Sequence, residues 1–64
     1  MSTTERFIET IEKRIISLTN QIKKGEITPA ESGIGKQFNR LKEMDLPAYE
    51  KLLVEYKKVL ASRT

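Results

Sequence analysis

The sequence contains no cysteine, no histidine and no tryptophan among its 64 residues. Without cysteine there can be neither a disulfide nor a thiolate metal site, and cysteine usage says nothing about the redox compartment. Without histidine the chain lacks the commonest neutral metal ligand and the usual general base. We therefore expect a non-enzymatic protein that has no catalytic residues, needs no metal or other cofactor, and acts on no small-molecule substrate.

Long apolar runs are also missing. Hydrophobic residues make up 38% of the chain, but no segment approaches the roughly 20 consecutive apolar residues that span a bilayer. The first residues show no basic segment followed by an apolar one, which is the pattern of a secretory signal. We expect a cytoplasmic protein with no membrane partner.

Neither sign of charge dominates, and the net charge is +3. Acidic and basic residues cancel within residues 1–22 and again within residues 43–64. The excess of positive charge therefore lies in residues 23–42. This is a modest basic segment and not the polybasic tract of a nucleic-acid-binding tail.

Helical periodicity is what the sequence does contain, in three stretches. In the first, aliphatic residues recur every three or four positions, and Lys23, Lys24 and Gly25 follow as helix-ending residues. This pattern predicts a helix over residues 4–24, with Ser2 among the candidate capping residues. The periodic residues are Ile8, Ile11, Ile15, Leu18 and Ile22.

The second stretch has the clearest helix start. Thr28 is a capping residue, Pro29 suits the first helical position, and Glu31 completes a capping box. The prediction is a helix over residues 29–44. Gly33 and Gly35 within it each cost about 1 kcal/mol relative to alanine, so we expect the first two turns to be weak or bent.

The third stretch follows Asp45 and is predicted to be helical over residues 46–62. Either Asp45 caps this helix and Leu46 opens it, or Leu46 is the cap and Pro47 is the first helical residue. Its apolar stripe is wide, and we expect its two tyrosines to pack inward. The stripe consists of Leu46, Tyr49, Leu52, Leu53, Tyr56, Val59 and Leu60.

Short connections between the predicted helices fold each one back on its neighbour. The prediction is a single all-α domain over residues 1–64 with the architecture of a compact three-helix bundle. A helical hairpin with a kinked second arm is the alternative.

Residues 30–37 resemble a phosphate-binding loop, but Ala30 and Gln37 replace its first glycine and its magnesium-binding Ser or Thr. We do not expect nucleotide binding.

The favoured functional hypothesis is a small protein-interaction module, such as a regulator, inhibitor or adaptor. The helices carry more aliphatic surface than a thin core can bury, and an unburied apolar strip is typical of a binding surface. The partner is another protein or a second copy of the chain, which would make a homodimer. The predicted partner-binding residues are Phe7, Ile11, Ile15, Ile16, Leu52 and Val54.

The alternative is a nucleic-acid-binding module that uses the basic face of the second helix. Lysine and arginine hold phosphates, and asparagine can read base edges in the major groove. This hypothesis ranks second because Glu31 and Glu43 flank the face and because dedicated DNA-binding domains are usually more basic. Its predicted contacts are Lys36, Asn39 and Arg40, with Lys23 and Lys24 on phosphates.

Overall fold

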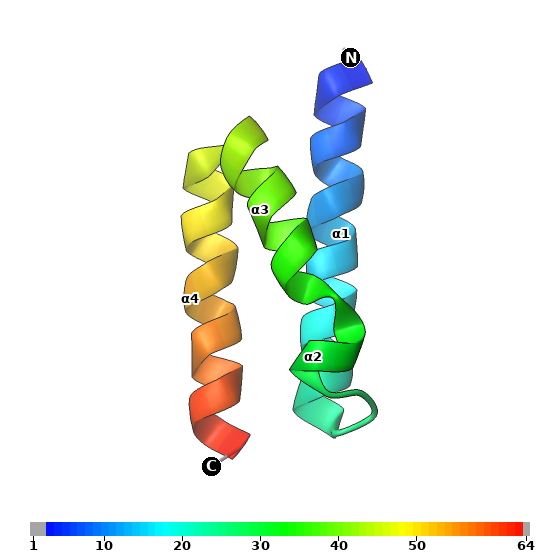
Figure 1. Ribbon diagram of the computed structural model, residues 1–64. Helices are drawn as coiled ribbons and strands as arrows, with labels where there is room; N and C mark the ends of the chain where they lie inside the picture. Colours follow the sequence, from blue (N-terminus) through cyan, green and yellow to red (C-terminus); the bar gives the residue numbers. More distant parts are fainter. Residues whose placement is uncertain (1–2, 64) are drawn as a thin grey trace.

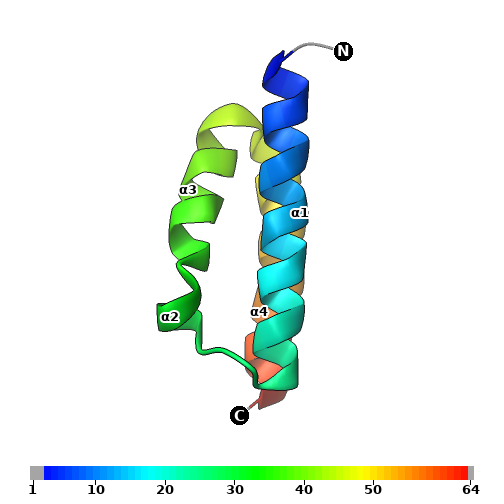
Figure 2. The ribbon, with the colours of Figure 1, turned by 90° about the vertical axis from the view of Figure 1, so that its right-hand side faces the viewer.

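The computed structural model describes residues 3–63, which form four helices: α1 (Thr3–Lys24), α2 (Pro29–Ser32), α3 (Ile34–Met44) and α4 (Leu46–Arg63). Helices α1 and α4 run parallel to each other, and α3 runs antiparallel to both on one side of the pair (Figure 1 and Figure 2). Each of the three long helices packs against the other two. The predicted compact three-helix bundle is therefore confirmed, and the kinked hairpin is not observed.

Helix α1 begins one residue before its predicted start and ends at the predicted residue. Gly25 follows in the left-handed region with φ 78°. Its N–H donates to the Ile22 carbonyl at 3.1 Å, and the Glu26 N–H donates to the Gln21 carbonyl at 2.9 Å. This pair of bonds is a Schellman motif, which turns the chain sharply back toward α3. The proposed capping role of Ser2 lies outside the described residues.

The predicted second helix is divided at Gly33. Thr28 caps α2 as expected, because its Oγ1 accepts a hydrogen bond from the Glu31 N–H at 3.2 Å. Gly33 then adopts φ 67°, which separates α2 from α3. The Ser32 hydroxyl bridges the break, donating to the Pro29 carbonyl at 2.7 Å and accepting from the Ile34 N–H at 3.1 Å. Gly35 lies within α3, so only the first of the two glycines interrupts the helix.

Alanine substitutions at these two glycines should change stability in opposite directions. At neither position would an added Cβ meet another atom within 4 Å, so backbone conformation decides the outcome. At Gly33 alanine would have to adopt a left-handed conformation, which costs about 1–2 kcal/mol. At Gly35 alanine favours the helix and should add about 0.4–1 kcal/mol. Urea denaturation measures both, and shifts of the same sign would contradict the break at Gly33.

The start of α4 follows the first of the two predicted alternatives. Leu46 is the first helical residue, and the Asp45 Oδ1 accepts a hydrogen bond from the Ala48 N–H at 3.2 Å. The Tyr49 N–H also donates to the Asp45 carbonyl at 3.0 Å. The carboxylate of Asp45 thus caps the helix, where negative charge is also favoured by the helix dipole.

The buried core is formed by α1 and α3. Phe38 contributes the largest core side chain, and its ring centroid lies 5.9 Å from that of Tyr49 and 5.4 Å from that of Tyr56. The predicted inward packing of both tyrosines is confirmed. The buried apolar residues are Ile11, Ile15 and Ile22 of α1 and Ile34, Phe38 and Leu41 of α3.

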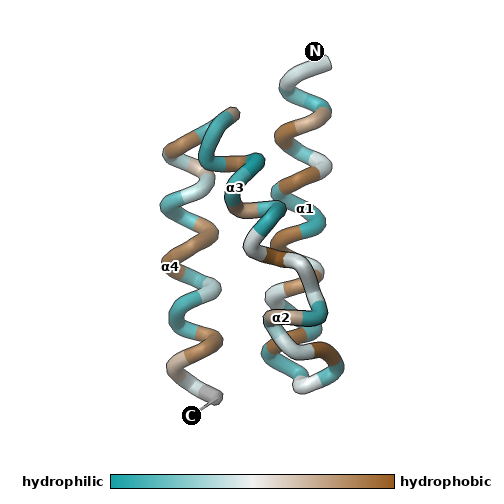
Figure 3. The backbone as a smooth tube through the Cα atoms, viewed as in Figure 1, coloured by the Kyte–Doolittle hydropathy of each residue, from teal (hydrophilic) through white to brown (hydrophobic). Residues whose placement is uncertain are grey.

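Helix α4 covers this core incompletely. Apolar positions recur along its whole length (Figure 3), yet none of its described side chains is buried. The wide stripe spreads over two flanks of α4, one toward α3 and one toward α1, and two neighbouring helices are too few to enclose it. Part of the apolar surface of α4 consequently remains in contact with solvent. The half-buried residues that it places against the core are Ala48, Tyr49, Leu52, Leu53, Tyr56, Val59 and Leu60.

Candidate functional site

An apolar groove with a volume of about 270 Å³ runs between α1 and α4. All of its lining residues come from these two helices. It therefore lies on the side of the α1–α4 pair that α3 leaves uncovered (Figure 2). The lining residues, which we call the α1–α4 groove, are Ile16, Thr19, Asn20 and Lys23 of α1 and Leu52, Glu55 and Val59 of α4.

Local helix geometry explains why these residues meet. On α1 the positions three, four and seven residues after Ile16 line the groove, and on α4 the positions three and seven residues after Leu52, which places each set on one face of its helix. Ile16 and Leu52 line the same groove, and Lys23 follows Ile16 by the same seven residues that separate Val59 from Leu52. The two faces therefore stay in register along the whole groove.

Three aliphatic side chains determine the character of the groove. Ile16 is 48% exposed, while Leu52 and Val59 are half-buried. Thr19 is buried beneath them, and its hydroxyl donates to the Ile15 carbonyl at 2.7 Å. That hydroxyl needs no outside partner. An apolar occupant above it would therefore not strand the Thr19 hydroxyl.

Charges of opposite sign border the two ends of the groove. At the end where α1 begins, four carboxylates surround a shallow depression: Glu5, Glu9 and Glu12 of α1 and Asp45 of the α3–α4 connection. At the other end Lys23 lines the groove, and the Lys58 Nζ lies 3.8 Å from the Glu55 carboxylate. The α1 side of this face thus changes from acidic through apolar to basic along its length, whereas α4 contributes Glu55, which is paired with Lys58.

Two of the predicted partner-binding residues, Ile16 and Leu52, line the groove. Two others, Ile11 and Ile15, are buried in the core and are not accessible to a partner. Their stripe on α1 is the one that α3 and α4 cover. A sequence stripe by itself does not reveal whether another helix of the same chain covers it.

The last two predicted partner-binding residues are exposed elsewhere on the molecule. Phe7 precedes Ile16 by nine residues, which places it about 180° around α1. Val54 follows Leu52 by two residues and lies about 160° around α4 from it. Neither residue borders the groove. Of the three exposed residues that were predicted to bind a partner, only Ile16 therefore belongs to the groove.

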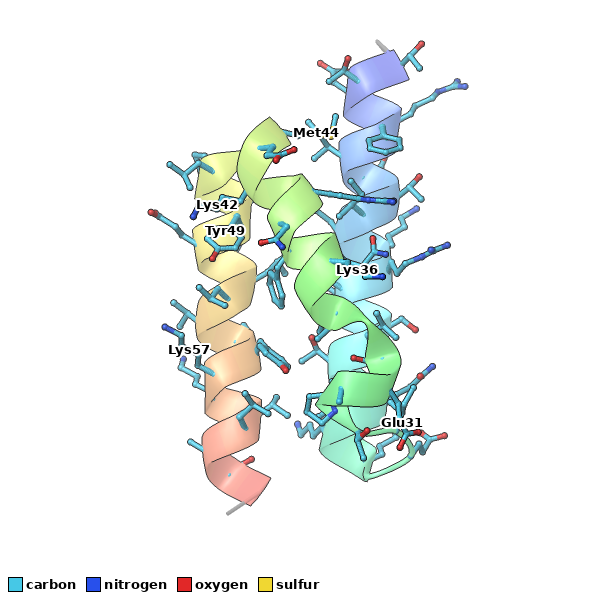
Figure 4. The ribbon with its side chains drawn as sticks, in the orientation of Figure 1. Glu31, Lys36, Lys42, Met44, Tyr49 and Lys57 are labelled. Carbon is cyan, nitrogen blue, oxygen red and sulfur yellow. The ribbon has the colours of Figure 1, made fainter. Side chains whose placement is uncertain are left out.

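The residues predicted to contact nucleic acid do not lie on one face of the molecule. Lys36, Asn39 and Arg40 are exposed on α3, and Figure 4 shows Lys36 near the start of the helix. Lys23, in contrast, lines the groove on the opposite side of the bundle. The α3 face alone offers two cations beside the acidic Glu43, fewer than the several phosphate contacts on which such binding depends.

Another lysine of α3 interacts within the chain. The Lys42 Nζ lies 5.8 Å from the centroid of the Tyr49 ring, and the two side chains are neighbours in Figure 4. This distance is typical of a cation–π contact. Lys42 therefore supports the packing of α3 on α4.

The groove also contains four residues that were not predicted to belong to a site, namely Thr19, Asn20, Glu55 and Val59. Their spacing from Ile16 and Leu52 was visible in the sequence, but the parallel pairing of α1 with α4 was not. Lys23 had been assigned to phosphate binding, and its position in the groove gives it a different set of neighbours. Predicting these residues would have required the tertiary arrangement of α1 and α4, which the sequence pattern does not contain.

No helix within residues 3–63 is long and apolar enough to cross a bilayer. The same part of the chain brings together no three acidic side chains in a geometry that suits a metal ion. Comparisons with protein-family models, curated proteins and solved structures gave no match. The functional interpretation therefore depends on the geometry and charge of the α1–α4 groove.

Proposed function

We propose that the chain is a non-enzymatic protein-interaction module, a regulator, inhibitor or adaptor, whose α1–α4 groove packs against helices of a protein partner. The observation that carries this proposal is the exposed Ile16 side chain beside a groove walled by Leu52 and Val59. Aliphatic side chains on two adjacent helices form an apolar face against which helices of a partner can pack.

Docking in the groove would also stabilise the bundle. Among the residues whose burial the structure describes, six make up the buried apolar core, and none of these lies in α4. A partner helix over Leu52 and Val59 would remove part of the remaining apolar surface of α4 from water, which contributes about 25 cal/mol per Å². The partner would bind the folded chain and not the unfolded chain. Its binding free energy would therefore add to the stability of the fold.

A photo-crosslinking residue at position 16 should capture a protein, whereas the same residue at position 54 should not. Ile16 and Val54 are 48% and 52% exposed, so both sites tolerate a bulky replacement and differ mainly in location. We suggest incorporating benzoylphenylalanine at each position in the cells that make the protein, irradiating them, and identifying the adducts by mass spectrometry.

The expected result is an adduct from position 16 that is absent or much weaker from position 54. Equal labelling at the two positions would mean that the groove is not preferred over ordinary exposed surface. A complete lack of adducts at position 16 would contradict the proposed function.

A further inference from the structure

We infer that the partner at the α1–α4 groove is a second copy of this chain, whose own α1–α4 face packs against it in antiparallel orientation. This inference rests on the proposed function and names its partner. It is carried by the order of charges along the groove face and by their symmetric spacing about Ile16.

One face of α1 extends from the acidic depression to the end of the α1–α4 groove. Glu9 lies seven residues before Ile16 and Lys23 lies seven residues after it. At 1.5 Å per residue, each charge is about 10 Å from Ile16 along the helix axis, in opposite directions. Both are exposed, and neither forms an ion pair with another described residue. The residues of this face are Glu5, Glu9, Glu12, Ile16, Asn20 and Lys23.

A two-fold axis through Ile16, lying in the interface and perpendicular to α1, uses this symmetry. It places Ile16 against Ile16 of the second copy, and it places Glu9 of each copy opposite Lys23 of the other. The same ion pair therefore forms twice. Leu52 lies beside Ile16 in the groove, so Leu52 from both copies extends the apolar centre. Such a self-complementary patch is what an isologous dimer requires.

The antiparallel orientation follows from the carboxylates. In a parallel dimer the acidic ends of both copies, each containing Glu5, Glu9, Glu12 and Asp45, would lie together and repel. The antiparallel arrangement moves each acidic end toward the Lys23 end of the other copy. It also opposes the dipoles of α1 in the two copies, with the N-terminal half of one over the C-terminal half of the other.

The size of the face suits a dimer of modest affinity. The chain measures 39 × 19 × 16 Å, so its α1–α4 side presents up to roughly 700 Å², close to the ~800 Å² that each partner buries in a standard complex. Burial of the apolar side chains at the centre would stabilise the dimer, and the charged residues at the two ends would determine its orientation.

Charge reversal at the two paired positions tests the inference. Glu9→Lys or Lys23→Glu alone replaces two attractive pairs with two repulsive ones, and each should raise the dimer Kd about tenfold. The double variant Glu9→Lys/Lys23→Glu restores both pairs with their signs exchanged, and its Kd should return to within about threefold of the wild-type value. Sedimentation equilibrium at low ionic strength measures these constants, because salt screens exposed pairs.

The chain provides matched controls for both reversals. Glu50 and Lys24 are exposed and do not line the groove. Glu50→Lys and Lys24→Glu make the same changes in net charge as the test variants and should leave the dimer Kd unchanged within about twofold. If the test and control variants change the dimer Kd equally, the change is due to net charge, and the proposed pairing of Glu9 with Lys23 is wrong.

Two other results would overturn the second copy as occupant. One is a wild-type mass that remains 7.4 kDa at millimolar concentration. The other is a double variant that associates no better than the single variants. A photo-crosslink from position 16 to a different protein would then still support the proposed function. The absence of any crosslink at that position would contradict both the proposed function and the second copy as partner.

Discussion

Phe38→Ala is expected to abolish stable folding of the monomer. Phe38 is 5% exposed and lies between the rings of Tyr49 and Tyr56, so its truncation opens a cavity where α3 meets α4. Such a change costs about 3–5 kcal/mol. A chain of 64 residues has a total stability of only about 3–10 kcal/mol. The loss is therefore comparable to the whole stability of the fold.

Circular dichroism with urea denaturation measures this effect, and the other phenylalanine of the chain supplies its control. Phe7 is 47% exposed and lies outside the core. Phe7→Ala should change the free energy of unfolding by less than about 0.5 kcal/mol. Comparable losses in the two variants would mean that the aromatic cluster does not hold α3 and α4 together.

The helices themselves were predictable because their signals are local. Aliphatic spacing identified α1 and α4, and the Thr28 cap and the left-handed Gly25 lie where the sequence indicated. Each of these signals involves residues within one or two turns of each other. The helix bounds that these signals predict are retained in the fold because tertiary packing does not oppose them.

The break within residues 29–44 shows the limit of local signals. Gly33 and Gly35 are alike in sequence, and both reduce helix stability. Only Gly33 adopts a positive φ, because the bend there lets the Ser32 hydroxyl bridge the two helices while Ile34 enters the core. A choice between two glycines separated by one residue depends on burial, which propensity does not encode.

The candidate site was predictable only in part, for the same reason. Ile16 stood out because it lies off the main apolar stripe of α1, and it is exposed in the groove. Ile11 and Ile15 lie on that stripe and are covered by the rest of the chain. Val59 completes the groove only because α4 lies parallel to α1. Which stripes are covered and which remain open depends on helix pairing, which the sequence pattern leaves undetermined.

Ile16→Glu is expected to raise the dimer Kd more than 100-fold and to leave the monomer folded. The substitution removes the apolar contact at the two-fold axis and brings a carboxylate from each copy together there, where like charges repel and lose hydration. In the monomer, however, Ile16 is 48% exposed. A charged side chain at this position can stay in water, so the free energy of unfolding should change by less than about 1 kcal/mol.

Val54→Glu is the matched control for this variant. Val54 is 52% exposed, also on the surface of a long helix, but it faces away from the groove. The same change in charge and a similar loss of aliphatic surface should leave dimerisation within about twofold of wild type. Urea denaturation of both variants confirms that any loss of association occurs in a folded chain.

Light scattering across a concentration series measures most directly whether the groove is an interface between copies. The wild-type chain and Val54→Glu should rise from 7.4 kDa toward twice that mass, while Ile16→Glu should remain at the monomer mass throughout. An Ile16→Glu variant that dimerises as readily as the wild type, or a wild-type chain that never exceeds the monomer mass, would contradict an interface centred on Ile16.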